Sequence, residues 1–120
     1  MAVSAVGLAV AAGAAPALAK RPTPKLVGNP AAGKPLFVAN CGTCHTLKAA
    51  GSVGTIGPNL DKLAPKLSEA TIIKQIRQGG SALMGKAAAK YTTQMVGYAG
   101  VLSTAQIDDI AAFVYTSTHK

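Results

Sequence analysis

The feature that most constrains this chain is a pair of cysteines, the only two among its 120 residues. Cys41 and Cys44 are separated by two residues, and His45 follows directly. Cysteines at this spacing occur in disulfides, in half of a metal site, in thiol redox motifs and in haem attachment sites, so the spacing alone decides nothing. The adjacent His narrows the choice, because two such thiols can add across the two vinyl groups of a haem while the imidazole reaches the iron.

The alternatives to haem need partners that the sequence does not supply. A thioredoxin-like thiol pair requires a strand before the cysteines and a βαβ context, and no convincing strand is predicted. A zinc site requires further Cys or His ligands, and His119, next to last in the chain, is the one remaining candidate. The pattern therefore predicts one covalently bound haem c, attached through Cys41 and Cys44, with His45 as an iron ligand.

The hydrophobic pattern predicts an all-α domain, and its first helix precedes the cysteines. Asn29 is suited to cap this helix and Pro30 to occupy its first position, where a missing N–H costs nothing. The helix extends over residues 31–40 and turns Phe37 inward, while Pro35 removes one backbone hydrogen bond and should bend it.

Two further helices follow. One is predicted over residues 68–78, and the other begins at Ser103, with Gln106 as its capping-box partner. The stretches between helices, residues 51–67 and 79–102, are long for loops without a core of their own. Something must therefore bind them together.

Four further segments keep the order of one known family when they are combined with the Cys41–His45 motif. The chain from Asn29 onward resembles the class I c-type cytochromes, the small monohaem bacterial cytochromes c. The resemblance implies the cytochrome c fold, three main helices and long loops wrapped around one covalently bound haem c. The four segments are Gly33-Lys34-Pro35-Leu36-Phe37, Gly57-Pro58-Asn59-Leu60, Met95-Val96-Gly97-Tyr98 and Phe113-Val114-Tyr115.

The resemblance also indicates the second iron ligand. Met95 stands where the family has its methionine ligand, although Val96 replaces the Pro that commonly follows. Met84 is the alternative, as is an open or His-filled site, and His119 is interpreted as a solvated terminal residue. The resemblance further implies that the Pro58 carbonyl accepts a hydrogen bond from His45, which would fix the tautomer of the ring.

Charge indicates the kind of partner. The net charge is +8, from twelve Lys and Arg against four Asp and Glu. We expect acidic redox-partner proteins, such as a quinol-oxidising complex, a terminal oxidase or a reductase, to bind a monomer. Nucleic acid is not expected, since only two residues are Arg and no aromatic is interleaved with basic residues. The lysines that could form a docking face are Lys48, Lys62, Lys66, Lys74, Lys86 and Lys90.

The first residues predict export. Residues 1–19 are uncharged and apolar and end in Ala17-Leu18-Ala19, which fits a signal peptide for a periplasmic protein, although no basic residue precedes the apolar run. An uncleaved membrane anchor is the alternative, and it would allow membrane association. Residues 20–28 form a Pro-rich lead-in, and residues 29–120 form the monohaem domain.

With both axial positions of the iron filled, the resemblance implies a one-electron carrier between redox partners and not an enzyme. Two alternatives stay open. If Met95 does not bind iron, a peroxidase or a gas-reactive protein becomes the second interpretation. If residues 1–19 are not cleaved, the protein is a fixed subunit of a larger redox assembly.

Overall fold

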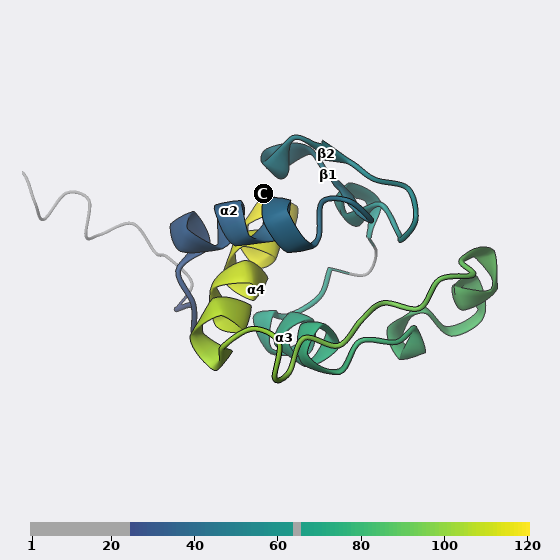
Figure 1. Ribbon diagram of the computed structural model, residues 1–120. Helices are drawn as coiled ribbons and strands as arrows, with labels where there is room; N and C mark the ends of the chain where they lie inside the picture. The colour runs from purple at the N-terminus through teal and green to yellow at the C-terminus, as the bar shows by residue number, and fades with distance from the viewer. Residues whose placement is uncertain (1–24, 64–65) are drawn as a thin grey trace, which may run out of the picture.

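In the part of the chain that the structure describes, three α-helices carry the fold, and short 3-10 turns and one pair of very short strands connect them (Figure 1). The computed structural model describes residues 25–63 and 66–120, so the predicted signal peptide and residues 20–24 of the lead-in lie outside the described residues. The helices are α2 (Pro30–Asn40), α3 (Glu69–Gln78) and α4 (Thr104–Thr118). The prediction of an all-α domain with three main helices is confirmed. Within the two described ranges, no helix is both long and apolar enough to cross a membrane.

Helix α2 begins where the sequence predicts. Asn29 lies at its N-cap, and its Oδ1 accepts hydrogen bonds from the backbone N–H groups of Ala31 (2.9 Å) and Ala32 (3.4 Å). These bonds satisfy donors that the first helical turn leaves unpaired. The helix continues through Pro35 to Asn40, so the hydrogen bond lost at the proline does not end it.

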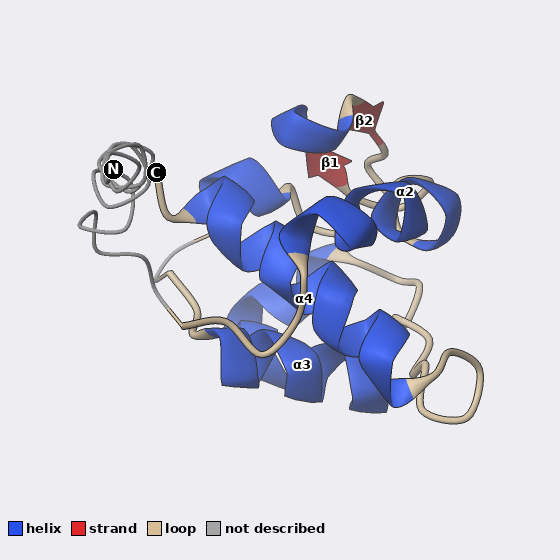
Figure 2. Ribbon diagram, turned by 90° about the vertical axis from the view of Figure 1, so that its left-hand side faces the viewer, coloured by secondary structure: helices blue, strands red, loops and turns tan. Residues whose placement is uncertain are grey.

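Helix α2 crosses α4 at close range (Figure 2). A Cβ atom on Gly33 would lie only 2.0 Å from the Asp109 carbonyl oxygen, so the two backbones can approach this closely only at a glycine. One turn further on, the rings of Phe37 and Phe113 pack with their centroids 5.7 Å apart. The expectation that Phe37 points inward is confirmed, since its side chain is 1% exposed.

Capping side chains also set the beginnings of α3 and α4. Ser68 Oγ accepts a hydrogen bond from the Thr71 N–H (3.1 Å) at the start of α3. Ser103 Oγ accepts from the Gln106 N–H (3.1 Å), and Gln106 Oε1 accepts from the Ser103 N–H (3.0 Å), which is the predicted capping box. Both helices turn apolar side chains into the shared core, which includes Ile72, Ile76, Ile107, Ile110 and Val114.

The chain just before α2 is held by acidic side chains of the other two helices. The Glu69 carboxylate, which is 9% exposed, accepts hydrogen bonds from the backbone N–H groups of Val27 and Gly28. Asp109 Oδ1 accepts from the Asn29 N–H at 2.9 Å. The end of the lead-in is therefore fixed to the domain, which the sequence did not indicate.

The expectation that the chain has no strand was wrong in one place. β1 (Thr46–Leu47) and β2 (Ser52–Val53) pair antiparallel around the 3-10 turn η1 (Lys48–Ala50). Gly51, at φ 69°, reverses the chain, and Ser52 Oγ links the strands through hydrogen bonds to the His45 carbonyl (2.8 Å) and the Leu47 N–H (3.1 Å). Strands of two residues are too short to produce an alternating pattern.

Besides β2, the described residues of the two long connections form 3-10 turns and irregular segments. η2 (Leu60–Lys62) lies in the first connection, and η3 (Ala82–Lys90) lies in the second. η3 consists of two turns joined at Gly85, and none of its residues is buried. In Figure 1 the segment that carries η3 extends away from α3 and α4.

Candidate haem site

The largely apolar cavity of about 380 Å³ lies between the Cys41–Leu60 region, the inner faces of α3 and α4, and the long connection that follows α3. Its lining includes every side chain predicted to bind haem or iron: Cys41, Cys44, His45 and Met95, together with Pro58. The structure therefore brings together residues that are up to 54 positions apart in the sequence (95 − 41).

A tight turn at the end of α2 presents the two thiols and the imidazole to this cavity. The N–H groups of Cys44 and His45 both donate to the Cys41 carbonyl, at 3.1 and 3.0 Å. Both thiols are free. Burial, and to a smaller extent the neighbouring Cys44, raises the pKa of Cys41 to about 12. Cys41 is thus a neutral thiol at neutral pH, whereas thiol redox motifs depend on a lowered thiol pKa.

The orientation of His45 follows from its hydrogen bond. His45 is 9% exposed, and its Nδ1 lies 2.8 Å from the Pro58 carbonyl oxygen. A carbonyl can only accept, so Nδ1 carries a proton, and Nε2 is the ring nitrogen that remains available to bind a metal. Gly57 packs on the ring, where an added Cβ would lie 2.7 Å from His45 Cε1. The Gly57 N–H also donates to the Cys44 carbonyl at 2.7 Å, which ties this loop to the cysteine turn.

The segment around Met95 is anchored to the end of α3. The N–H groups of Tyr98 and Ala99 donate to the carbonyls of Ile76 (2.8 Å) and Arg77 (3.2 Å), which lie in the last turn of α3 and have no partner within the helix. The Met95 carbonyl accepts from the Gly80 N–H at 2.9 Å.

Glycines allow this close contact. A Cβ on Gly79 would lie 2.5 Å from both the Met95 carbonyl oxygen and the Gly97 N. Gly79 and Gly80, at φ 69° and 77°, thus end α3 and also make room for the methionine segment.

Met84 lines the same cavity but is held differently. It lies in η3, where no residue is buried, and its backbone N–H donates only within that turn, to the Ser81 carbonyl (3.0 Å). Both methionine side chains therefore reach the cavity, but the two segments differ in their contacts, since the Met95 segment is hydrogen-bonded to the end of α3.

Two polar contacts at the cavity were not anticipated from the sequence. The Tyr98 hydroxyl donates to the Asn40 carbonyl at 2.9 Å, and burial in the first place raises the pKa of Tyr98, so the phenol stays protonated. The Gln75 amide donates to Met95 Sδ at 3.4 Å. One signal for Gln75 was available, since it is a polar residue on the helical face that also carries Ile72 and Ile76.

These residues fit an iron porphyrin. The walls are mainly apolar, two thiols and a thioether line the cavity, and the His45 imidazole is oriented by the Pro58 carbonyl. Imidazole with thioether is a known axial pair for haem iron. The zinc alternative gains no support, because residues 25–63 and 66–120 contain no group of three or more His, Cys, Asp and Glu side chains placed to hold a metal ion.

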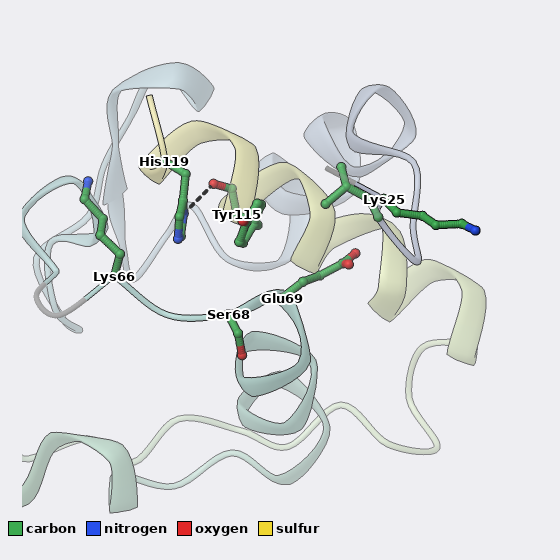
Figure 3. Close-up of a pocket in the computed structure, with 7 residues that line it drawn as sticks. Lys25, Lys66, Ser68, Glu69, Tyr115 and His119 are labelled. Atoms are coloured by element: carbon green, nitrogen blue, oxygen red, sulfur yellow. Dashed lines mark hydrogen bonds between the residues drawn. The ribbon is translucent and has the colours of Figure 1, made fainter. Parts of the chain in front are cut away.

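A second, open pocket lies on another part of the surface and shares no residue with the cavity (Figure 3). Its lining includes Lys25, Lys66, Glu69 and His119. The two lysines point away from each other in Figure 3, and Lys66 Nζ donates to the Thr118 carbonyl. His119 is exposed and stacks on Tyr115. It does not line the cavity, in keeping with its interpretation as a terminal solvated residue.

The fold and the cavity together define an all-α protein built to enclose a covalently held haem. Comparison with known proteins gives the family. A family model described as "Cytochrome c" matches residues 30–118, so this chain belongs to the cytochrome c family. Among solved structures it is similar to the c-type cytochrome SorU from Sinorhizobium meliloti, with 26% identity and a TM-score of 0.54 over 75% of this chain and 91% of that one. No curated protein gives a significant match.

Membership of this family settles the coarse identity. The fold is the cytochrome c fold, the cofactor is a covalently attached haem c, and the chemistry is haem-based electron transfer. The expected family, fold and cofactor are thereby confirmed.

Proposed function

We propose that this protein is a mobile one-electron carrier whose haem c is attached through Cys41 and Cys44 and ligated by His45 and Met95. The observation that carries the proposal is that both ligand side chains line one cavity and that each is held by contacts of its own. His45 is oriented by the Pro58 carbonyl, and Met95 is anchored to the end of α3.

This arrangement favours electron transfer over catalysis. The haem, when bound, supplies a site that accepts and releases one electron. His45 and Met95 would fill both axial positions and so leave none for peroxide, oxygen or another substrate. The buried phenylalanine pair and the close packing of α2 on α4 keep the His45 side of the site rigid. Little needs to move during turnover, since the same side chains serve both oxidation states.

The surface beside the cavity supports docking to an acidic protein. Residues 70–107 contain no Asp or Glu and four basic residues, which the structure exposes: Lys74, Arg77, Lys86 and Lys90. Three exposed apolar side chains, Ile56, Leu83 and Val96, also line the cavity. Exposed apolar side chains at the cavity, together with a stretch of chain that carries positive charge and no carboxylate, suit a brief, salt-dependent encounter with an acidic redox partner. This set keeps three of the predicted lysines and adds Arg77. It omits Lys48, Lys62 and Lys66, which lie outside residues 70–107.

We further propose that residues 1–19 direct export and are removed, so that a monomer beginning near Lys20 works outside the cytoplasm. The apolar run, the Ala17-Leu18-Ala19 triplet and the covalent attachment of the haem support this proposal. Mass spectrometry of the purified protein tests it, because an intact Met1 would favour the anchored alternative.

The ligand assignment is tested with Met95→Ala and its matched control Met84→Ala. Loss of the thioether opens an axial position, so Met95→Ala should lower the reduction potential and abolish the weak long-wavelength band of ferric iron with a thioether ligand. Cyanide should bind the ferric Met95→Ala protein at least about tenfold more tightly, the factor that corresponds to 1.4 kcal/mol of lost competition. Absorbance titration and potentiometry of the purified holoproteins provide the measurements.

Met84→Ala should leave all three properties at their wild-type values. If the effects appear in Met84→Ala instead, the sixth ligand lies in η3 and the assignment is wrong. If the wild-type protein already binds cyanide rapidly and tightly, the iron has an open site, and the peroxidase or gas-reactive interpretation replaces electron transfer.

A further inference from the structure

We propose that Gln75 is a positioning residue for Met95, whose side-chain amide fixes which lone pair of the sulfur faces the haem cavity. The inference rests on the proposed function, in which Met95 is the iron ligand. Gln75 is the polar residue between Ile72 and Ile76 on the face of α3 that lines the cavity. Its side chain is half-buried, so its amide needs hydrogen-bond partners within the protein.

The amide has two acceptors within reach, and both need a donor. Gln75 Nε2 lies 2.9 Å from the Gly80 carbonyl oxygen and 3.4 Å from Met95 Sδ. A carbonyl oxygen and a thioether sulfur can only accept, so the NH₂ end of the amide must face them, and each of its two N–H bonds has one acceptor. The orientation of this amide is therefore set by chemistry.

The contact closes a ring of hydrogen bonds around the methionine. The Gln75 amide donates to the Gly80 carbonyl, and the Gly80 N–H donates to the Met95 carbonyl at 2.9 Å. The Gln75 amide also donates to the Met95 sulfur, which completes the ring. Both the backbone and the side chain of Met95 are thus tied to the end of α3. This arrangement differs from that of Met84, whose side chain has no hydrogen bond among the described residues.

The ring has a consequence for ligation. A thioether sulfur has two lone pairs, and the amide N–H occupies one of them, which leaves the other for the metal. Gln75 would therefore select one configuration at the ligating sulfur and reduce the freedom that Met95 loses when it binds iron. An apolar residue at position 75 would fill the same space without either effect.

The test uses Gln75→Leu and Gln75→Ile, which remove the donor and keep side-chain bulk, with Gln94→Leu as the control. Gln94 is an exposed neighbour of Met95, and its Nε2 donates to Ser81 Oγ at 3.4 Å and not to the sulfur. Imidazole affinity is measured on each ferric holoprotein by absorbance. The Met95 ε-methyl signal is measured by NMR on the reduced form, where the ring current of the haem reports the position of the methyl group.

Both Gln75 variants should bind imidazole about three- to tenfold more tightly, since a typical hydrogen bond no longer holds the competing sulfur. Their ε-methyl signal should shift, or split into two signals as both sulfur configurations become populated. Gln94→Leu should match the wild-type protein in both measurements. Far-ultraviolet circular dichroism checks the fold, and if Gln75→Leu is unfolded, Gln75→Ile decides alone.

Wild-type imidazole affinity and an unshifted methyl signal in the folded Gln75 variants would overturn the inference while leaving Met95 as the ligand. If the wild-type protein lacks the thioether band, or if the band is still present in Met95→Ala, the ligand assignment itself is wrong. The inference about Gln75 then loses its basis. The two failures are therefore separate.

Discussion

The α2–α4 pair and the η3 segment lie on different sides of the haem cavity and are built in opposite ways. Where α2 meets α4, a glycine brings the backbones into contact and two phenylalanine rings pack in the core. In η3 no residue is buried, and Leu83 is 51% exposed. The helical pair is thus stabilised by its own side chains, while η3 borders a cavity that we expect the haem to fill.

A small domain can thus combine a tightly packed side of the haem cavity with a side that is open to solvent. The attachment turn and His45 follow directly from α2 and inherit its rigidity. Met95 lies beyond η3, yet its position does not depend on η3, because hydrogen bonds attach it to the end of α3. The chain therefore places a well-anchored ligand next to an open surface, and the open surface remains free for a partner.

The largest expected effect is on the free energy of unfolding, when an aliphatic side chain is truncated to alanine in α4 and, for comparison, in η3. Ile107 in α4 is fully buried, and Ile107→Ala should lower the free energy of unfolding by about 2–5 kcal/mol through lost burial and a residual cavity. Leu83→Ala in η3 should cost less than Ile107→Ala, because the protein leaves half of that side chain exposed and only its contact with the haem adds to the loss. Denaturant unfolding of the holoproteins, followed by circular dichroism, measures both values. Equal losses would show that η3 is as tightly packed as the helical pair.

A smaller effect on stability is expected when the serine that precedes α4 or the serine that precedes η3 is replaced. Ser103→Ala removes the capping box of α4 and should cost about 1 kcal/mol. Ser81 precedes η3 and makes no capping hydrogen bond, so Ser81→Ala should change stability by less than about 0.5 kcal/mol. The same unfolding experiment applies, and a loss at Ser81 that matched the loss at Ser103 would contradict the view of η3 as a weakly held segment.

Local signals in the sequence were sufficient to predict the helices. Asn29, Ser68 and Ser103 act through contacts two or three residues away, so their caps can be recognised without knowledge of the fold. The cysteine motif was equally local, because its five residues form one turn.

Contacts between distant residues could not be predicted in this way. Gln75 meets Met95 across 20 residues, Glu69 meets Val27 across 42, and Tyr98 meets Asn40 across 58. Each depends on how the helices pack, which no single segment encodes. The preference for Met95 over Met84 came from the resemblance to the family and not from a local signal, and in the structure both side chains reach the cavity.

The most direct test of the account is the intact mass of the purified protein, produced in a host that exports proteins and attaches haem c, together with its ferric and ferrous absorbance spectra. The account predicts the mass of the polypeptide from Lys20 plus one haem, and spectra typical of a haem with imidazole and thioether ligands. A colourless protein with the mass of the bare polypeptide would contradict it.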